Sequence, residues 1–371
     1  MKRRYQLDFF RGIFLIIITI DHFLSDNNII KRFTYESVGW VTAAEGFVFL
    51  SGLTADLVYT HKYNNNSQKS LMMTATKRAW KIYQNHMVIF LLVILLLMSS
   101  EFMRESWAGK FDLLYEQPLL ALFLGATLLY QPDYLDILPM YAIFILIVPS
   151  VINLFRKGYI WQVLIVSALI YCVGIAIGVN NLADKFAWYI SIDMGEFNLL
   201  CWQFLFILGL VSGFLFYNGK TDRIIYNKKV IFISLLVAGG LLLAKTIHLD
   251  DYRIVGMLIG RSYLGPLRLL NFWALFIAVV FVSTKYADKF NNKLVCYLGQ
   301  YSLEVFSLHV FLIVLFKPLQ NYLNTFFFIK LTEHYVIYPL GTLILLFLII
   351  PSLYLAPKLL SQKARLAKQN W

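Results

Sequence analysis

A succession of long apolar runs limits what this chain can fold into more than any other feature. The runs lie at about 9–24, 41–59, 80–98, 138–155, 159–179, 199–217, 229–247, 267–284, 303–318 and 335–355. A helix needs about 20 mostly apolar residues to cross the hydrocarbon core of a bilayer. With 59% hydrophobic residues and a mean hydropathy of +0.66, the chain is predicted to be an all-α polytopic membrane protein rather than a soluble enzyme.

An eleventh apolar run, at 118–131, is short for a crossing, and the distribution of basic residues decides its place. If this run does not cross and the N-terminus is cytoplasmic, the inner segments carry 21 Lys and Arg and the outer segments carry 8. A crossing would reverse that excess. The positive-inside rule therefore selects a bundle of about ten transmembrane helices, with a short non-spanning helix near 118–131 and both termini in the cytoplasm. We expect residues 1–371 to form a single transmembrane domain.

The net charge of +12 does not indicate nucleic-acid binding, because the basic residues lie between the apolar runs. In that position they act as topology signals. Cys172, Cys201 and Cys296 are far apart in the sequence, so neither a disulfide framework nor a metal-binding spacing is visible. We expect no metal and no permanently bound cofactor.

Four ionisable residues, Asp8, Arg11, Asp21 and His22, lie in or next to the first apolar run. Eleven helical steps separate Arg11 from His22, which places both side chains on one face, about 16 Å apart along the axis. Asp8 stands one turn before Arg11 and is expected to form a structural pair with it. Such groups are costly inside a membrane, and they are kept there mainly for function.

Basic side chains at the cytoplasmic ends of the first and third runs suggest a donor with anionic phosphates. Arg11, Arg78 and Lys81 share this depth, and arginine and lysine bind phosphates well. Acyl-coenzyme A carries phosphates at one end and a thioester at the other, and its pantetheine arm is long enough to reach from Arg11 to His22. We therefore expect acyl-CoA as the donor substrate.

His22 is the candidate for the chemical step. In the apolar zone its imidazole should rest neutral, so that it can act as a general base for an incoming hydroxyl or carry the acyl group itself. Asp21 or Glu45 could stabilise the imidazolium that forms. Of the two carboxylates, Glu45 is favoured because it is expected to approach from a facing helix.

The acceptor is expected on the outer side, where polar residues gather at the ends of several runs. Asp136, Glu196 and Arg268 lie there, and His309 is near mid-depth in the ninth span. Asp136 could instead cap the following helix, and Arg268 could be an interfacial anchor. The remaining histidines are expected to be surface groups: His61, His86, His248 and His334.

Several stretches resemble a known family. Arg11-x10-His22 resembles the first-span signature of the membrane acyltransferase-3 superfamily, and an ordered set of motifs resembles its OpgC branch, the glucan succinyltransferases. In sequence order these motifs are Leu7–Gly12, Asp21–His22, Ala44–Gly52, Tyr134–Pro139, Trp202–Gln203, Leu264–Arg268 and Ser302–Phe306. The resemblance extends through nearly the whole chain.

The resemblance implies ten spans and an O-acyltransferase that moves a succinyl or acetyl group from cytoplasmic acyl-CoA to a glycan in the periplasm or at the cell surface. It also implies a location in the bacterial inner membrane. The wider superfamily often has Arg-x-x-Arg at the third span, whereas this chain has Arg78-Ala-Trp-Lys81. Lysine keeps the charge but lacks the bidentate fork of arginine, which weakens the expectation of donor contact at Lys81.

Other interpretations stay open from the sequence. Arg11 could mark the inner interface, His22 could be a core histidine, and Glu45 could hold helices together. The chain could also be a transporter or flippase for a glycan or an acyl carrier, although no paired half-repeat is visible. A membrane sensor or scaffold is a third class. The oligomeric state and the choice between succinyl and acetyl are not determined.

Overall fold

The computed structural model describes residues 5–24, 30–64, 67–179, 195–219, 226–249, 252–326, 328–330 and 337–355. The chain divides into two compact units, which we describe separately. The first unit comprises Met1–Arg3, Val38–Gln84 and Leu119–Ala287. The second unit comprises Arg4–Ser37, Asn85–Pro118 and Asp288–Trp371.

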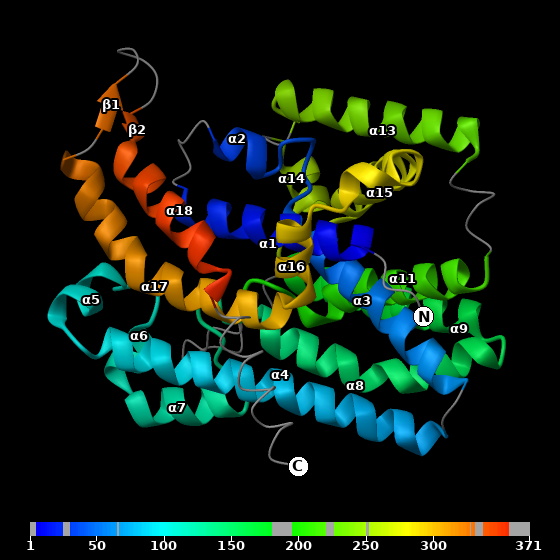
Figure 1. Ribbon diagram of the computed structural model, residues 1–371, viewed down its shortest axis with the longest axis horizontal. Helices are drawn as coiled ribbons and strands as arrows, with labels where there is room; N and C mark the ends of the chain where they lie inside the picture. Colours follow the sequence, from blue (N-terminus) through cyan, green and yellow to red (C-terminus); the bar gives the residue numbers. More distant parts are fainter. Residues whose placement is uncertain are drawn as a thin grey trace. The chain divides into compact units, whose positions relative to one another are not determined.

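Each of the ten predicted apolar runs corresponds to a helix (Figure 1). In chain order these helices are α1 (Tyr5–Phe23), α3 (Ala43–Tyr63), α4 (Gln68–Leu97), α8 (Ile137–Arg156), α9 (Ile160–Val179), α11 (Leu199–Tyr217), α13 (Lys228–Thr246), α15 (Pro266–Lys285), α17 (Ser302–Phe326) and α18 (Leu340–Ser352).

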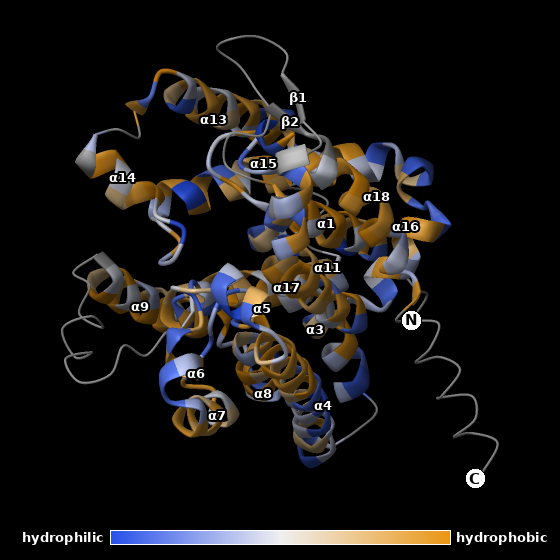
Figure 2. Ribbon diagram, turned by 90° about the vertical axis from the view of Figure 1, so that its left-hand side faces the viewer, coloured by the Kyte–Doolittle hydropathy of each residue, from blue (hydrophilic) through white to orange (hydrophobic). Residues whose placement is uncertain are grey.

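Seven helices among the described residues are long and apolar enough to cross a membrane: α4, α8, α9, α11, α13, α15 and α17. Of the other three helices that match predicted runs, α18 has 13 residues, whereas α1 and α3 have 19 and 21 residues and contain both acidic and basic side chains. Figure 2 shows the predominantly hydrophobic composition of helices such as α9 and α18. The prediction of an all-α polytopic membrane protein is confirmed.

The short run after α4 forms small helices that cannot cross a bilayer. Pro118–Ala126 is α7, whose nine residues extend only about 13 Å. It follows α5 (Glu101–Ser106) and α6 (Asp112–Glu116). The chain then turns at Leu128, which has a positive φ of 62°. The prediction of a non-spanning helix near 118–131 is confirmed, although the helix ends at Ala126.

In the first unit, α3 packs closely against α11 because glycines face the partner backbone. A Cβ built on Gly52 would lie 2.2 Å from the carbonyl oxygen of Phe206, and one on Gly209 would lie 2.3 Å from that of Phe49. Larger residues would force the helices apart, so these glycines set the helix separation. Helix α11 also packs on α8 and α9, and α13 packs on α15, which follows the short α14 (Arg253–Ile259).

In the second unit, α1 packs on α16 (Lys293–Gln300), α17 and α18. Gly12 faces the carbonyl oxygen of Val295, and Gly299 faces that of Asp8, so a Cβ at either glycine would collide with backbone. The unit also contains α2 (Lys31–Thr34) and a short antiparallel pair, β1 (Phe328–Lys330) and β2 (Ile337–Pro339). The 3-10 turn η2 (Ala287–Phe290) begins at its boundary.

A proline within α17 explains one contact of the second unit. Pro318 has no N–H, so the carbonyl of Val314, four residues earlier, loses its helical hydrogen bond. The indole Nε1 of Trp107 donates to this carbonyl at 3.2 Å. Neighbouring side chains commonly satisfy the backbone groups that prolines free in membrane helices. The segment between α4 and α7 is thereby attached to α17.

Candidate active site

The last turn of α1 positions His22. The final carbonyls of a helix have no intrahelical partner, and α17 supplies donors to two of them. Lys317 Nζ donates to the carbonyl oxygen of His22 at 2.9 Å, and Gln320 Nε2 donates to that of Phe23. The positive charge of Lys317 also suits the negative end of the helix dipole. These contacts fix the end of α1 on α17, and with it the backbone of His22.

The same pair of helices brings two imidazoles together. His22 of α1 stacks on His309 of α17, with ring centroids 5.5 Å apart and ring planes inclined by 20°. His22 is partly buried, whereas the side chain of His309 is completely buried. The edge of the Phe306 ring covers His309 at 4.5 Å between centroids. The two sequence-predicted histidines therefore form one cluster within the second unit.

The other predicted ionisable residues of α1 are also partly buried. Asp21 precedes His22 in the last turn, and Asp8 lies in the first turn, three residues before Arg11. Arg11 belongs to the second unit, whereas Arg78 and Lys81 are on the part of α4 that belongs to the first unit. Of the α4 pair, Arg78 is partly buried and Lys81 is exposed. A donor site formed by the three basic residues stays a prediction.

Glu45 is held by partners of its own unit. Its Oε2 accepts hydrogen bonds from the backbone N and the hydroxyl of Thr42, which forms a capping box at the start of α3. Its Oε1 pairs with Arg268 Nη1 at 2.7 Å, and Arg268 Nε donates to the carbonyl of Ile259 at 2.9 Å. Both side chains are buried. Glu45 therefore has a clear structural role, and its action on His22 stays a prediction.

Asp136 joins the start of α8 to the segment before α11. It occupies the N-cap position of α8, but its side chain makes no capping hydrogen bond. Its Oδ2 instead accepts the backbone N–H of Glu196 at 3.0 Å. Burial raises the pKa of Asp136 to about 7, against the opposing effects of its hydrogen bonds and of the nearby Arg261 charge. The alternative of a side-chain cap is thus wrong, and acceptor binding by Asp136 and Glu196 stays a prediction.

Three polar residues were not recognised from the sequence. Lys317 and Asp56 each stand within an apolar run, which was the available signal. Asp56 of α3 is buried, accepts a hydrogen bond from Thr60 at 3.1 Å, and has no partner for its second oxygen in the described structure. His86 of α4 was expected at the surface, but it is completely buried and stacks on Phe90. That expectation was wrong because His86 lies well inside the 30-residue α4.

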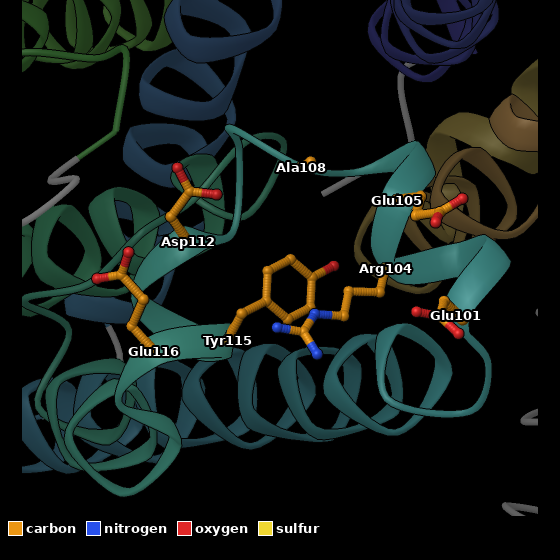
Figure 3. A pocket seen from close by; sticks show the side chains of 7 residues that line it. All are labelled: Glu101, Arg104, Glu105, Ala108, Asp112, Tyr115 and Glu116. Carbon is orange, nitrogen blue, oxygen red and sulfur yellow. The ribbon is translucent and has the colours of Figure 1, made fainter.

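A surface pocket is formed by residues of α5 and α6 in the second unit (Figure 3). These residues are distant in sequence from both histidines. Its volume is about 290 Å³. Arg104 lies over the Tyr115 ring, 5.4 Å from its centroid, among four carboxylates. These carboxylates belong to Glu101, Glu105, Asp112 and Glu116. Their excess negative charge would repel phosphates, so this pocket does not suit the nucleotide end of acyl-CoA.

The described residues contain neither a candidate metal-binding group nor a disulfide. Among the described residues, no group of three or more His, Cys, Asp or Glu side chains could hold a metal ion. Cys172, Cys201 and Cys296 are free thiols, of which Cys172 is exposed and the other two are buried. The side chains brought together at the histidine cluster are two imidazoles and the ammonium group of Lys317, which contacts the His22 carbonyl.

Comparison with known proteins gave one family match. The family model described as OpgC protein matches residues 3–350. No curated protein and no solved structure matches the chain. Because the family match covers nearly the whole chain, including both histidines, the chain belongs to the OpgC protein family, which indicates a glucan-modifying acyltransferase.

Proposed function

We propose that this protein is an integral-membrane O-acyltransferase. It moves a succinyl or acetyl group from acyl-CoA in the cytoplasm to a hydroxyl of a periplasmic or surface glycan. The observation that carries the proposal is the packing of His22 against His309, with Arg11 three turns from His22 on the same face of α1. The proposal includes a location in the bacterial inner membrane with both termini in the cytoplasm.

The donor end of the reaction is assigned to basic residues. Arg11, Arg78 and Lys81 bind the phosphates of acyl-CoA, with Arg11 separated from His22 by about the length of the pantetheine arm. The thioester carbonyl then lies at His22. This arrangement accounts for an arginine in the first two turns of a mostly apolar helix.

His22 drives the transfer in one of two ways. As a general base, it accepts the hydroxyl proton while the C–O bond forms and the C–S bond breaks, and the proton passes to the departing thiolate. As an acyl relay, it first takes the acyl group from the thioester and then yields it to the hydroxyl. Asp21 stabilises the positive charge on the ring. The residues expected from the sequence to bind the acceptor are Asp136, Glu196, Arg268 and His309.

The test compares glucans from cells that express the wild type, His22→Gln or His86→Gln. Mass spectrometry should find glucans heavier by a succinyl or an acetyl group with the wild type, which also identifies the donor. His22→Gln should give unmodified glucans, whereas His86→Gln is the matched control, because it alters another histidine that lies on a spanning helix of the second unit. Unmodified glucans with the wild type would refute the acyltransferase function and favour a transporter.

A further inference from the structure

The tautomer of His309 is fixed by its backbone neighbour. Its Nδ1 lies within hydrogen-bond distance of the carbonyl oxygen of Phe306, one turn earlier in α17. A carbonyl oxygen can only accept, so Nδ1 must carry the hydrogen. In a neutral ring, Nε2 then has a free lone pair. This nitrogen is buried and has no hydrogen-bond partner in the described structure.

The free lone pair of His309 lies next to the proposed acyl-transfer residue. The nearly parallel rings of His309 and His22 are 5.5 Å apart, so a group on one ring is within reach of the edge of the other. The bonds from Lys317 and Gln320 to the end of α1 hold the two helices together at this point. A buried acceptor without a partner is costly, and such groups call for an explanation.

We propose that His309 is a second catalytic residue, whose Nε2 takes the proton from the acceptor hydroxyl while His22 carries the acyl group. This inference rests on the acyltransferase function proposed above and selects the acyl-relay route. It assigns a separate task to each imidazole. It also changes the predicted role of His309 from binding the acceptor to activating it.

The reaction then proceeds in two balanced steps. A ring nitrogen of His22 attacks the thioester carbon, the C–N bond forms, the C–S bond breaks, and the His22 ring proton passes to the thiolate to give the free thiol of CoA. In the second step the glycan oxygen attacks the acyl carbon, and its proton moves to His309 Nε2. The C–N bond breaks, and the proton returns from His309 to His22. Both rings end neutral, and the product is an ester.

His86 is a second buried histidine, and comparing it with His309 shows which features of His309 go beyond burial. Neither ring nitrogen of His86 has a hydrogen-bond partner among the described residues, and that ring stacks on Phe90. Among the described residues no carbonyl accepts from its ring, and its stacking partner is a phenyl ring rather than a second imidazole. A merely structural histidine should resemble His86, so His86→Gln is the matched control.

The experiment uses purified full-length protein, labelled succinyl-CoA or acetyl-CoA, and glucan that can be added or withheld. His309→Gln keeps polarity, and His309→Phe keeps a stacking ring, but both lack the lone pair of Nε2. Without glucan, wild type and both variants should become labelled on His22. With glucan, the wild type should transfer its label, whereas the variants should transfer at least about 100-fold more slowly, as expected for a lost base. His86→Gln should transfer at the wild-type rate.

Three outcomes would overturn the inference and leave the acyltransferase function intact. The first is rapid transfer by a His309 variant. The second is loss of His22 labelling in folded His309 variants, since that would place His309 in the first step. The third is a wild type that transfers acyl groups without any label on His22. If neither variant folds, His309→Asn replaces them, because its side-chain amide can still donate to the Phe306 carbonyl while Nε2 is absent, and the same slow transfer is expected. Absence of transfer by the wild type would instead refute the proposed function itself.

Discussion

Replacing Glu45 by Gln should expose how strongly the first unit depends on one buried ion pair. The carboxylate faces Arg268 at 2.7 Å, and the two side chains are 0% and 4% exposed. Glutamine keeps the shape and one acceptor oxygen, which can still serve Thr42. Its NH₂ group, however, would then face the Arg268 guanidinium, placing donor against donor. The arginine would remain charged and lose the carboxylate at 2.7 Å.

The size of the expected loss in unfolding free energy follows from the burial of the ion pair. Removing one partner of a buried pair typically destabilises a protein by about 3–5 kcal/mol, because an uncompensated charge remains. The carbonyl of Ile259 keeps its bond to Arg268 and limits the loss. Replacing both residues, as Glu45→Gln with Arg268→Met, removes the buried charge and should cost less than the sum of the single changes. Glu101→Gln makes the same chemical change at an exposed position and should stay within about 0.5 kcal/mol.

Unfolding free energies in mixed detergent micelles provide the assay, with acyl transfer measured on the same samples. A loss below about 1 kcal/mol for Glu45→Gln would refute the reasoning, because Arg268 would then have to be neutralised by another group. The activity measurement separates the two roles considered for Glu45. A well-folded Glu45→Gln protein without activity would support its action on His22, and normal activity would assign it to structure alone.

Three further predictions concern the donor site, the start of α8 and helix packing. Arg11→Ala should weaken acyl-CoA binding tenfold or more in a calorimetric titration, because a charged hydrogen bond to phosphate contributes about 1.5–3 kcal/mol; unchanged affinity would remove Arg11 from the donor site. The raised pKa of Asp136 means that the folded protein holds a proton that the unfolded chain releases, so its contribution to stability should fall as the pH rises from 3.8 to about 7. Asp136→Asn should abolish this part of the pH dependence, and an identical pH profile of unfolding would contradict the assignment. Gly52→Ala should cost about 1–3 kcal/mol of unfolding free energy, since its Cβ would meet backbone, whereas Gly239→Ala meets nothing within 4 Å and should be tolerated; equal stabilities would contradict the packing argument.

Much of the fold could be predicted from local properties of the sequence. The apolar runs located all ten helices, because the length of a span and the satisfaction of its backbone are properties of a single segment. The charge count separated α7 from the spans because the distribution of Lys and Arg over all the connecting segments can be read from the sequence. The sequence also placed Arg11 and His22 on one face of α1, since helical periodicity needs no partner. The sequence indicated His309 only through its expected position near the middle of the ninth span.

The partners of these residues could not be predicted in that way. His309 stacks on His22 although 287 positions separate them, and Lys317 caps the helix that carries His22. Likewise, Glu45 was expected to serve His22, and the structure gives it Thr42 and Arg268 as partners. Spacing along one helix says which residues share a face, but not which helix covers that face. That choice follows from the packing of small residues such as Gly12 and Gly299, whose contacts arise only once distant segments are brought together.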